Sequence, residues 1–152
     1  MISKNLSCIV VLLFLSACGY QSIYTNMNNQ NISINKISLS GNLNINRKII
    51  NLTRIEENKQ KNPDSYNLNL ISTKLKETVA KDSLGNASVF KMTININFSL
   101  ENKNQKNKNK NFKASFLYNN SNNKFGLSQY EKTIENNLIE KLAEEIIIFI
   151  NL

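Results

Sequence analysis

The sequence is defined first by what it lacks. Its 152 residues contain no histidine, no tryptophan, two cysteines, one proline and eleven acidic residues. Both cysteines, Cys8 and Cys18, fall within the first eighteen residues, so the chain beyond them cannot form a disulfide and its fold must be stabilised by burial alone. Without histidine or a spare thiol, the commonest zinc ligands and nucleophile–base pairs are absent. We therefore expect no catalytic residue, no metal and no cofactor.

Long hydrophobic runs are also missing, with one short exception at the start of the chain. Lys4 precedes an apolar run, Leu6 to Leu15, of about ten residues, which is typical of a secretory signal peptide and too short to span a bilayer. The run ends in Leu-Ser-Ala-Cys, the lipobox of bacterial lipoproteins. The pattern predicts cleavage between Ala17 and Cys18 and acylation of the Cys18 thiol. In the alternative, an ordinary signal peptide, Cys18 only happens to follow a small residue.

The expected organisation is a signal peptide at 1–17, an acylated tether at 18–31 and a single domain at 32–152. The net charge of +8 is a weak guide to partners, because Asn, Lys and Ile share A/T-rich codons and together make up 65 of the residues. An exported, membrane-tethered chain would not ordinarily meet nucleic acid. The anionic partner open to it is a lipid headgroup.

Alternating apolar residues predict four strands. The first covers Ile32 to Leu39, and its broken alternation indicates a bulge. The second begins at Tyr66 and extends weakly through Lys76. The third alternates from Phe90 to Leu100 and the fourth from Phe112 to Tyr118, separated by a lysine- and asparagine-rich loop at 102–111. Regular alternation predicts a sheet covered on one side. Four side chains are expected in the core: Phe90, Met92, Phe98 and Phe116.

Two segments have helical periodicity. The first is expected from about Arg47 to Lys59, capped by Asn44 or Asn46. The second begins at the capping box Ser128-x-x-Glu131 and continues with an isoleucine- and leucine-rich stripe. The predicted fold class is α+β, a four-stranded mostly antiparallel or mixed sheet with two helices on one face, in the order β-α-β-β-β-α.

At this point the residues resemble a known family. The mature start, Cys-Gly-Tyr-Gln-Ser-Ile-Tyr at Cys18 to Tyr24, resembles the C-G-[FWY]-x-x-[LI]-[YR] start of the LptE lipopolysaccharide-assembly lipoproteins. The element order is similar, as is the ending, where the strand end Ala114 to Asn120 precedes a polar loop and a long terminal helix. Gly19 after the acylated cysteine agrees with release to the outer membrane of a Gram-negative bacterium.

The resemblance implies a non-enzymatic outer-membrane lipoprotein that plugs the LptD barrel, assists its assembly and helps lipopolysaccharide to reach the cell surface. The closest counterparts of the family's basic lipopolysaccharide contacts are Lys81 and Lys124; the alternative is that each is a solvated lysine. The lysines of the 102–111 loop are expected to keep a flexible loop soluble, and gripping an acidic surface is the alternative. The runner-up function is a stand-alone envelope lipoprotein that binds a ligand or acts as a scaffold without a barrel partner.

Overall fold

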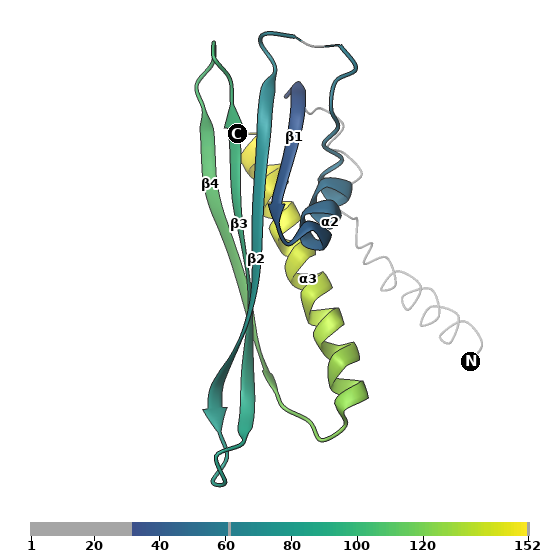
Figure 1. Ribbon diagram of the computed structural model, residues 1–152, viewed down its shortest axis with the longest axis vertical. Helices are drawn as coiled ribbons and strands as arrows, with labels where there is room; N and C mark the ends of the chain where they lie inside the picture. Colours follow the sequence, from purple (N-terminus) through teal and green to yellow (C-terminus); the bar gives the residue numbers. More distant parts are fainter. Residues whose placement is uncertain (1–31, 61, 152) are drawn as a thin grey trace, which may run out of the picture. The chain divides into compact units, whose positions relative to one another are not determined.

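A computed structural model describes residues 32–60 and 62–151. The predicted signal peptide, the tether and Cys18 lie outside the described residues. Six elements follow one another: β1 (Ile34–Gly41), α2 (Leu43–Thr53), β2 (Tyr66–Lys81), β3 (Ala87–Glu101), β4 (Lys108–Asn119) and α3 (Lys124–Ile150). This is the predicted β-α-β-β-β-α order (Figure 1).

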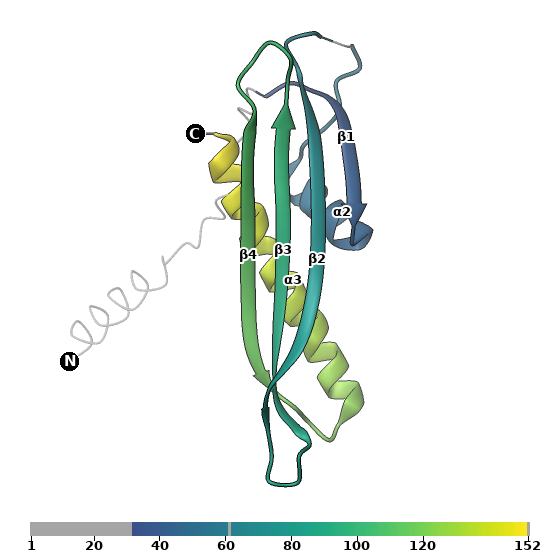
Figure 2. The same ribbon diagram turned by 60° about the vertical axis from the view of Figure 1, so that its left-hand side comes forward.

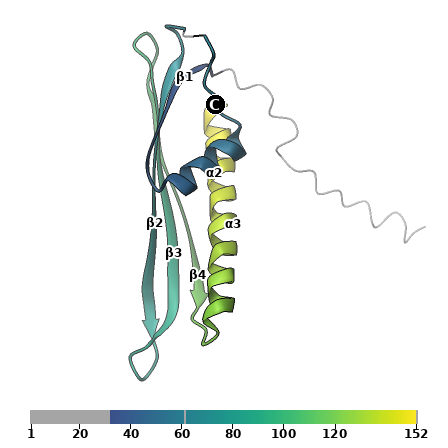
Figure 3. The same cartoon turned by 45° about the vertical axis from the view of Figure 1, so that its right-hand side comes forward.

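The four strands form one mixed sheet in the order β1-β2-β3-β4, in which β1 is parallel to β2 and the other pairs are antiparallel. Figure 2 shows the strands side by side, and Figure 3 shows both helices on the same side of the sheet. The predicted fold class is confirmed. The predicted bulge is also present, as a register shift between Ile34 and Lys36 in the pairing of β1 with β2.

The core lies between the sheet and the helices. In β3 the inward positions from Met92 to Leu100 are almost inaccessible, and α3 covers them with buried positions such as Leu142 and Ile146. Each large side chain buried in this way contributes about 1.5–3 kcal/mol. Near the end of α3, Phe149 meets Phe98 and Phe112 edge-on, at centroid separations of 6.1 and 5.8 Å. The core prediction is confirmed for Met92 and Phe98, while Phe90 is partly buried.

Phe116 corrects the core prediction, because it is 46% exposed. Phe116 lies on the same face of β4 as the buried residues Ala114 and Tyr118, but β4 is an edge strand of the sheet. Phe116 pairs with Met92 of β3. At this level two ion pairs hold α3 to β2, which lies on the other side of β3 from β4. The helix therefore leaves the ring of Phe116 partly uncovered.

Helix α2 begins and ends earlier than predicted. The side chain of Asn42, not Asn44 or Asn46, caps it by accepting from the backbone N–H of Ile45 at 3.2 Å. Asn46 is fully buried and donates its amide to the carbonyl of Ser40 at 2.7 Å. The helix stops at Thr53, because Arg54 takes a left-handed conformation with φ of 53° and the chain continues without helix.

Helix α3 begins four residues before the predicted capping box. Asn123 caps it by accepting from the N–H of Gly126 at 2.9 Å, so Ser128 lies inside the helix. The sheet also exceeds its predicted bounds: β2 continues to Lys81, and β4 begins at Lys108 rather than at Phe112. The loop between β3 and β4 is correspondingly shorter than 102–111. None of the helices in the described part of the chain combines the length and apolarity needed to span a bilayer.

Candidate functional site at the hairpin end

The two lysines singled out from the sequence lie at the same end of the domain. Lys81 is the last residue of β2 and pairs with Ala87, the first residue of β3. Lys124 opens α3, directly after the loop that leaves β4. Antiparallel pairing brings that loop beside the β2–β3 turn, since Val89 pairs with Asn119. The fold thus brings together two segments that are about forty residues apart in the sequence.

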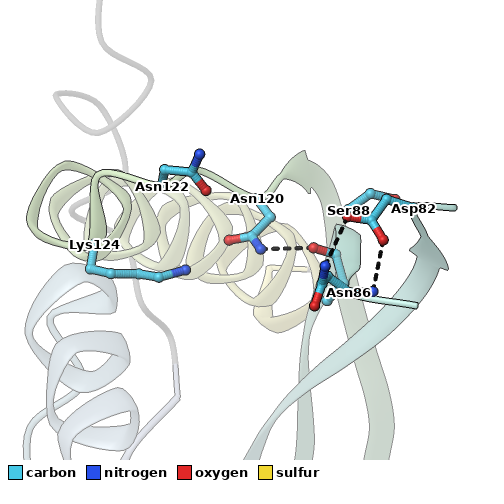
Figure 4. Close-up of a pocket in the computed structure, with 7 residues that line it drawn as sticks. Asp82, Asn86, Ser88, Asn120, Asn122 and Lys124 are labelled. Atoms are coloured by element: carbon cyan, nitrogen blue, oxygen red, sulfur yellow. Dashed lines mark hydrogen bonds between the residues drawn. The ribbon is translucent and has the colours of Figure 1, made fainter. Parts of the chain in front are cut away.

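An open cavity of about 650 Å³ lies between these two segments. Figure 4 shows that the Lys124 side chain extends toward Asn120 across this space. Lys124 belongs to the lining and Lys81 does not, although its neighbour Asp82 does. The lining comprises Asp82, Asn86, Ala87, Ser88, Asn120, Asn122 and Lys124. The cavity is therefore polar, with one cation and one carboxylate among amides, a hydroxyl and backbone.

The carboxylate of Asp82 organises the β2–β3 turn. One oxygen accepts from the N–H groups of Leu84 and Asn86 at 2.9 and 2.8 Å, and the other accepts from the Asn86 amide at 3.2 Å. Gly85 closes the turn with φ of +83°, and its N–H donates to the Asp82 carbonyl. The bonds from Asn86, the largest cause, hold the pKa of Asp82 below its usual value against a small opposing effect of burial. The Asp82 carboxylate thus accepts three hydrogen bonds from the turn that it belongs to.

The opposite wall is held to the turn by Asn120. Its side-chain amide donates to the carbonyl of Ala87 at 2.7 Å, and its backbone N–H donates to the carbonyl of Ser88 at 2.8 Å. Lys124 rests against its own loop, with Nζ 3.3 Å from the Ser121 carbonyl. That bond leaves two of the three ammonium donors available. The Lys124 ammonium favours an anionic group in the cavity, whereas the Asp82 carboxylate in the same lining opposes one.

Exposed apolar side chains accompany the cavity at this end. Leu84, at the tip of the β2–β3 turn, is 85% exposed, and Phe125, in the first turn of α3, is 75% exposed. Both side chains lie at the hairpin end, one on the β2–β3 turn and one at the start of α3. Neither residue stands out in the sequence, because neither belongs to an alternating or helical stripe.

Two ion pairs hold the N-terminal half of α3 against β2. Lys76 contacts Glu131 at 2.6 Å and Lys74 contacts Glu135 at 2.7 Å, while Tyr118 of β4 donates to Glu131 at 2.9 Å. Partial burial raises the pKa of Glu131, but the bonds from Lys76 and Tyr118 and the nearby charges outweigh it, so the net pKa is lowered. Burial, together with the bond to Glu131 and its charge, raises the pKa of Tyr118. Glu131, predicted as a capping residue, instead joins α3 to the sheet.

The sheet face opposite the helices is open and rich in amides. Outward positions of β3 and β4 place Asn97 beside Asn111, whose amides are hydrogen-bonded, and Ser99 beside Asn109 at 2.9 Å. Three outward apolar side chains, Ile71, Leu75 and Leu117, are 43%, 50% and 59% exposed. This face confirms the wet surface that the alternation predicts. Nothing among the described residues gathers three acidic side chains into a metal-binding group.

Comparison with known proteins gives a family and a fold. A family model described as "LptE: Lipopolysaccharide-assembly" matches residues 22–150. No curated protein matches the sequence. The structure resembles rare lipoprotein B from Shewanella oneidensis, with 15% identity and a TM-score of 0.58 over 74% of this chain and 91% of that one. It also resembles a minor lipoprotein from Acinetobacter baumannii, with 13% identity and a TM-score of 0.59 over 78% and 89%. A third similar structure is uncharacterized lipoprotein B from Nitrosomonas europaea, with 8% identity, a TM-score of 0.56 and coverage of 76% and 80%. At these identities the likeness is one of fold.

Proposed function

The chain belongs to the LptE family, and on that premise we propose that it is an outer-membrane lipoprotein, acylated on Cys18, that plugs an LptD-type barrel and assists its assembly for lipopolysaccharide transport. The observation that carries the proposal is the span of the family match, residues 22–150, which includes every helix and strand of the domain. The proposed role is structural and non-enzymatic.

The surface of the domain supports a plug. A body seated in a water-filled lumen needs a polar exterior, because its partner wall is lined by polar side chains and water. The open sheet face is largely polar, with hydrogen-bonded amides at Asn97 and Asn111 beside the exposed apolar side chains of Ile71, Leu75 and Leu117. Non-obligate protein interfaces are, as a whole, about as apolar as the rest of the protein surface. A largely polar sheet face with a few apolar side chains is therefore compatible with binding to a barrel wall.

The hairpin end supports contact with lipopolysaccharide, and we propose Lys81 and Lys124 as the contacts. Ammonium groups bind the phosphate and carboxylate groups of such a headgroup through charge-assisted hydrogen bonds. Lys124 extends across a polar cavity, and Lys81 stands at its margin beside Asp82. The exposed side chains of Leu84 and Phe125 offer apolar surface at the same end.

The decisive test is a mild-detergent pull-down of the tagged, acylated protein with mass spectrometry of what remains bound. We expect a stoichiometric barrel protein of LptD type. Recovery of the lipoprotein alone in several detergents would support a stand-alone envelope protein instead. Depletion of the protein is expected to leave the barrel misassembled and surface lipopolysaccharide reduced; normal folding of the barrel in depleted cells would contradict the proposal.

A second test addresses the two lysines. Lys81→Gln and Lys124→Gln are expected to weaken lipopolysaccharide binding while the barrel still co-purifies, because both side chains are solvent-exposed and neither supports the core. Lys113→Gln is the matched control, since Lys113 is also exposed but lies on the outward face of β4, paired with Asn95. Equal loss of binding in all three variants would assign the effect to net charge rather than to the hairpin end.

A further inference from the structure

The loop that joins β3 to β4 carries a concentration of positive charge at the end of the domain opposite the hairpin tip. From residue 102 to residue 119 the sequence contains no acidic residue. Within the described part of the chain, the side chains of Lys103, Lys106 and Lys108 have no ion pair and no hydrogen bond. Lys110 lies over the rings of Phe112 and Phe149, with Nζ 4.9 and 5.2 Å from their centroids. We call these four lysines the basic end.

Several hydrogen bonds join this loop to the segment before β2. Asn102 donates its side-chain amide to the carbonyl of Ser65 at 2.8 Å, and its N–H donates to Asn107 at 3.0 Å. Gln105 donates to the carbonyl of Asp64 at 2.9 Å. The backbone that carries the lysines is therefore hydrogen-bonded to the segment before β2, which places their charges at this end of the domain.

The chain enters the domain at this same end. The hydroxyls of Ser33 and Ser65 are 2.5 Å apart, and the N–H of Tyr66 donates to the carbonyl of Ser33 at 2.8 Å. Ser65 is also the residue whose carbonyl accepts from Asn102 of the basic loop. Fourteen positions separate Ile32 from Cys18, so a fully extended tether would reach at most about 50 Å from Ile32.

We propose that the basic end docks on the anionic phospholipid headgroups of the membrane leaflet that holds the acyl chains of Cys18. The proposal rests on the acylation that the proposed function includes. Charge complementarity identifies the occupant: lysines within roughly a Debye length of an anionic bilayer surface are attracted to it, and a tether to an acyl anchor in that bilayer raises their effective concentration near the surface.

Docking in this way sets the distance between the hairpin end and the headgroups that the basic end contacts. β3 has 15 residues and connects the basic end to the β2–β3 turn, a length of about 50 Å at about 3.3 Å per residue. A bilayer with its headgroups is about 40–45 Å thick. A domain that stands along the membrane normal inside a barrel, with its basic end at the inner headgroups, therefore carries the Lys124 cavity to the level of the outer headgroups.

The experiment uses a property of the sequence, the absence of tryptophan, so that one introduced indole is the only reporter. Asn104→Trp places it in the basic loop, where the Asn104 side chain makes only a 3.5 Å contact with Asp64. Leu84→Trp places it at the opposite tip, where the native side chain is 85% exposed. Each full-length, acylated variant is inserted into phosphatidylcholine vesicles with or without phosphatidylglycerol, and quenching by lipids brominated on their acyl chains is measured.

We expect the indole at position 104 to be quenched in vesicles that contain phosphatidylglycerol, and the indole at position 84 to remain unquenched. In the Asn104→Trp background, Lys103→Gln, Lys106→Gln and Lys108→Gln together are expected to lower the ratio of docked to undocked protein about fivefold per lysine. The matched control is an equal change of charge at three exposed lysines outside the basic end: Lys113, Lys132 and Lys141.

Two results would overturn the proposal: equal quenching in vesicles of phosphatidylcholine alone, or equal effects of the two triple variants. A stronger response to lipopolysaccharide aggregates than to phosphatidylglycerol vesicles would also overturn it, because the headgroup recognised would then be the transported lipid. Recovery of the barrel by the same protein is scored separately. A barrel bound without lipid docking refutes this inference alone, whereas loss of the barrel refutes the proposed function.

Discussion

Gly41 is the position where a single added carbon should be most informative. It ends β1 with φ of +76°, and a Cβ there would lie 2.2 Å from the carbonyl oxygen of Ser72, a backbone atom of β2. Gly41→Ala would therefore add two penalties. The left-handed conformation costs an L-residue about 1–2 kcal/mol. The clash must be relieved by separating the chains at a point where Asn42 donates to Ser72 at 2.9 Å and the Ser72 hydroxyl donates back at 3.0 Å.

Loss of those two hydrogen bonds adds about 0.5–1.5 kcal/mol each, so the free energy of unfolding should fall by about 2–5 kcal/mol. Gly85→Ala is the matched control. Gly85 has nearly the same φ, +83°, but an added Cβ would meet nothing within 4 Å, so only the conformational cost of about 1–2 kcal/mol remains. The control isolates the steric contribution from the conformational one.

The assay is urea unfolding of the two variants and the parent chain, followed by circular dichroism, with m-values compared so that altered denatured states are recognised. Thermal midpoints should fall by about 4 °C for each kcal/mol in a domain of this size. Equal losses in the two variants would refute the reasoning, because they would show that the approach of Gly41 to Ser72 imposes no steric demand.

Three further predictions follow from the corrected elements. Asn123→Ala should lower the free energy of unfolding in urea by about 1 kcal/mol, because Asn123 caps α3. Ser128→Ala should change it by less than about 0.5 kcal/mol, and a larger loss for Ser128→Ala than for Asn123→Ala would show that Ser128 is the cap. Ionised Glu131 should stabilise the fold above its ordinary pKa of 4.5, and this contribution, below about 1 kcal/mol for so accessible a pair, should disappear as pH falls through the lowered folded pKa. Glu131→Gln should flatten that part of the stability–pH curve, and an unchanged curve would contradict the assignment. Phe98→Ala should cost about 3–5 kcal/mol in unfolding free energy, whereas Phe116→Ala should cost about 1–2 kcal/mol because Phe116 is already 46% exposed; similar costs would mean that Phe116 is covered.

The order of elements and the identity of most core residues follow from the sequence, for a local reason. In β3 every second residue from Met92 to Leu100 is apolar, and a pleated strand places such residues on one face regardless of what covers them. The bulge near Ile34 is also predictable from the sequence, because a break in the alternation of apolar and polar residues is a local signal. The family resemblance at the mature start agrees with a family model that matches residues 22–150.

Helix starts were less predictable, because several asparagines compete for each cap. Asn42, Asn44 and Asn46 have equal capping ability, and the choice of Asn42 depends on the close approach of Gly41 to Ser72 that ends β1. Asn123 and Ser128 compete similarly at α3. The sequence alone cannot rank such candidates, since the decision is made by where the preceding strand must end.

Only the tertiary structure decided which side chains meet. Phe116 and Tyr118 share a strand face and a periodicity, yet α3 contacts Tyr118 through Glu131 and leaves Phe116 half exposed. Lys124 and Asp82 line one cavity because antiparallel pairing returns β4 to the β2–β3 turn. Periodicity states which face of its own element a residue occupies. What covers that face depends on the path of a helix or strand distant in sequence, and that path is fixed by packing of the whole domain.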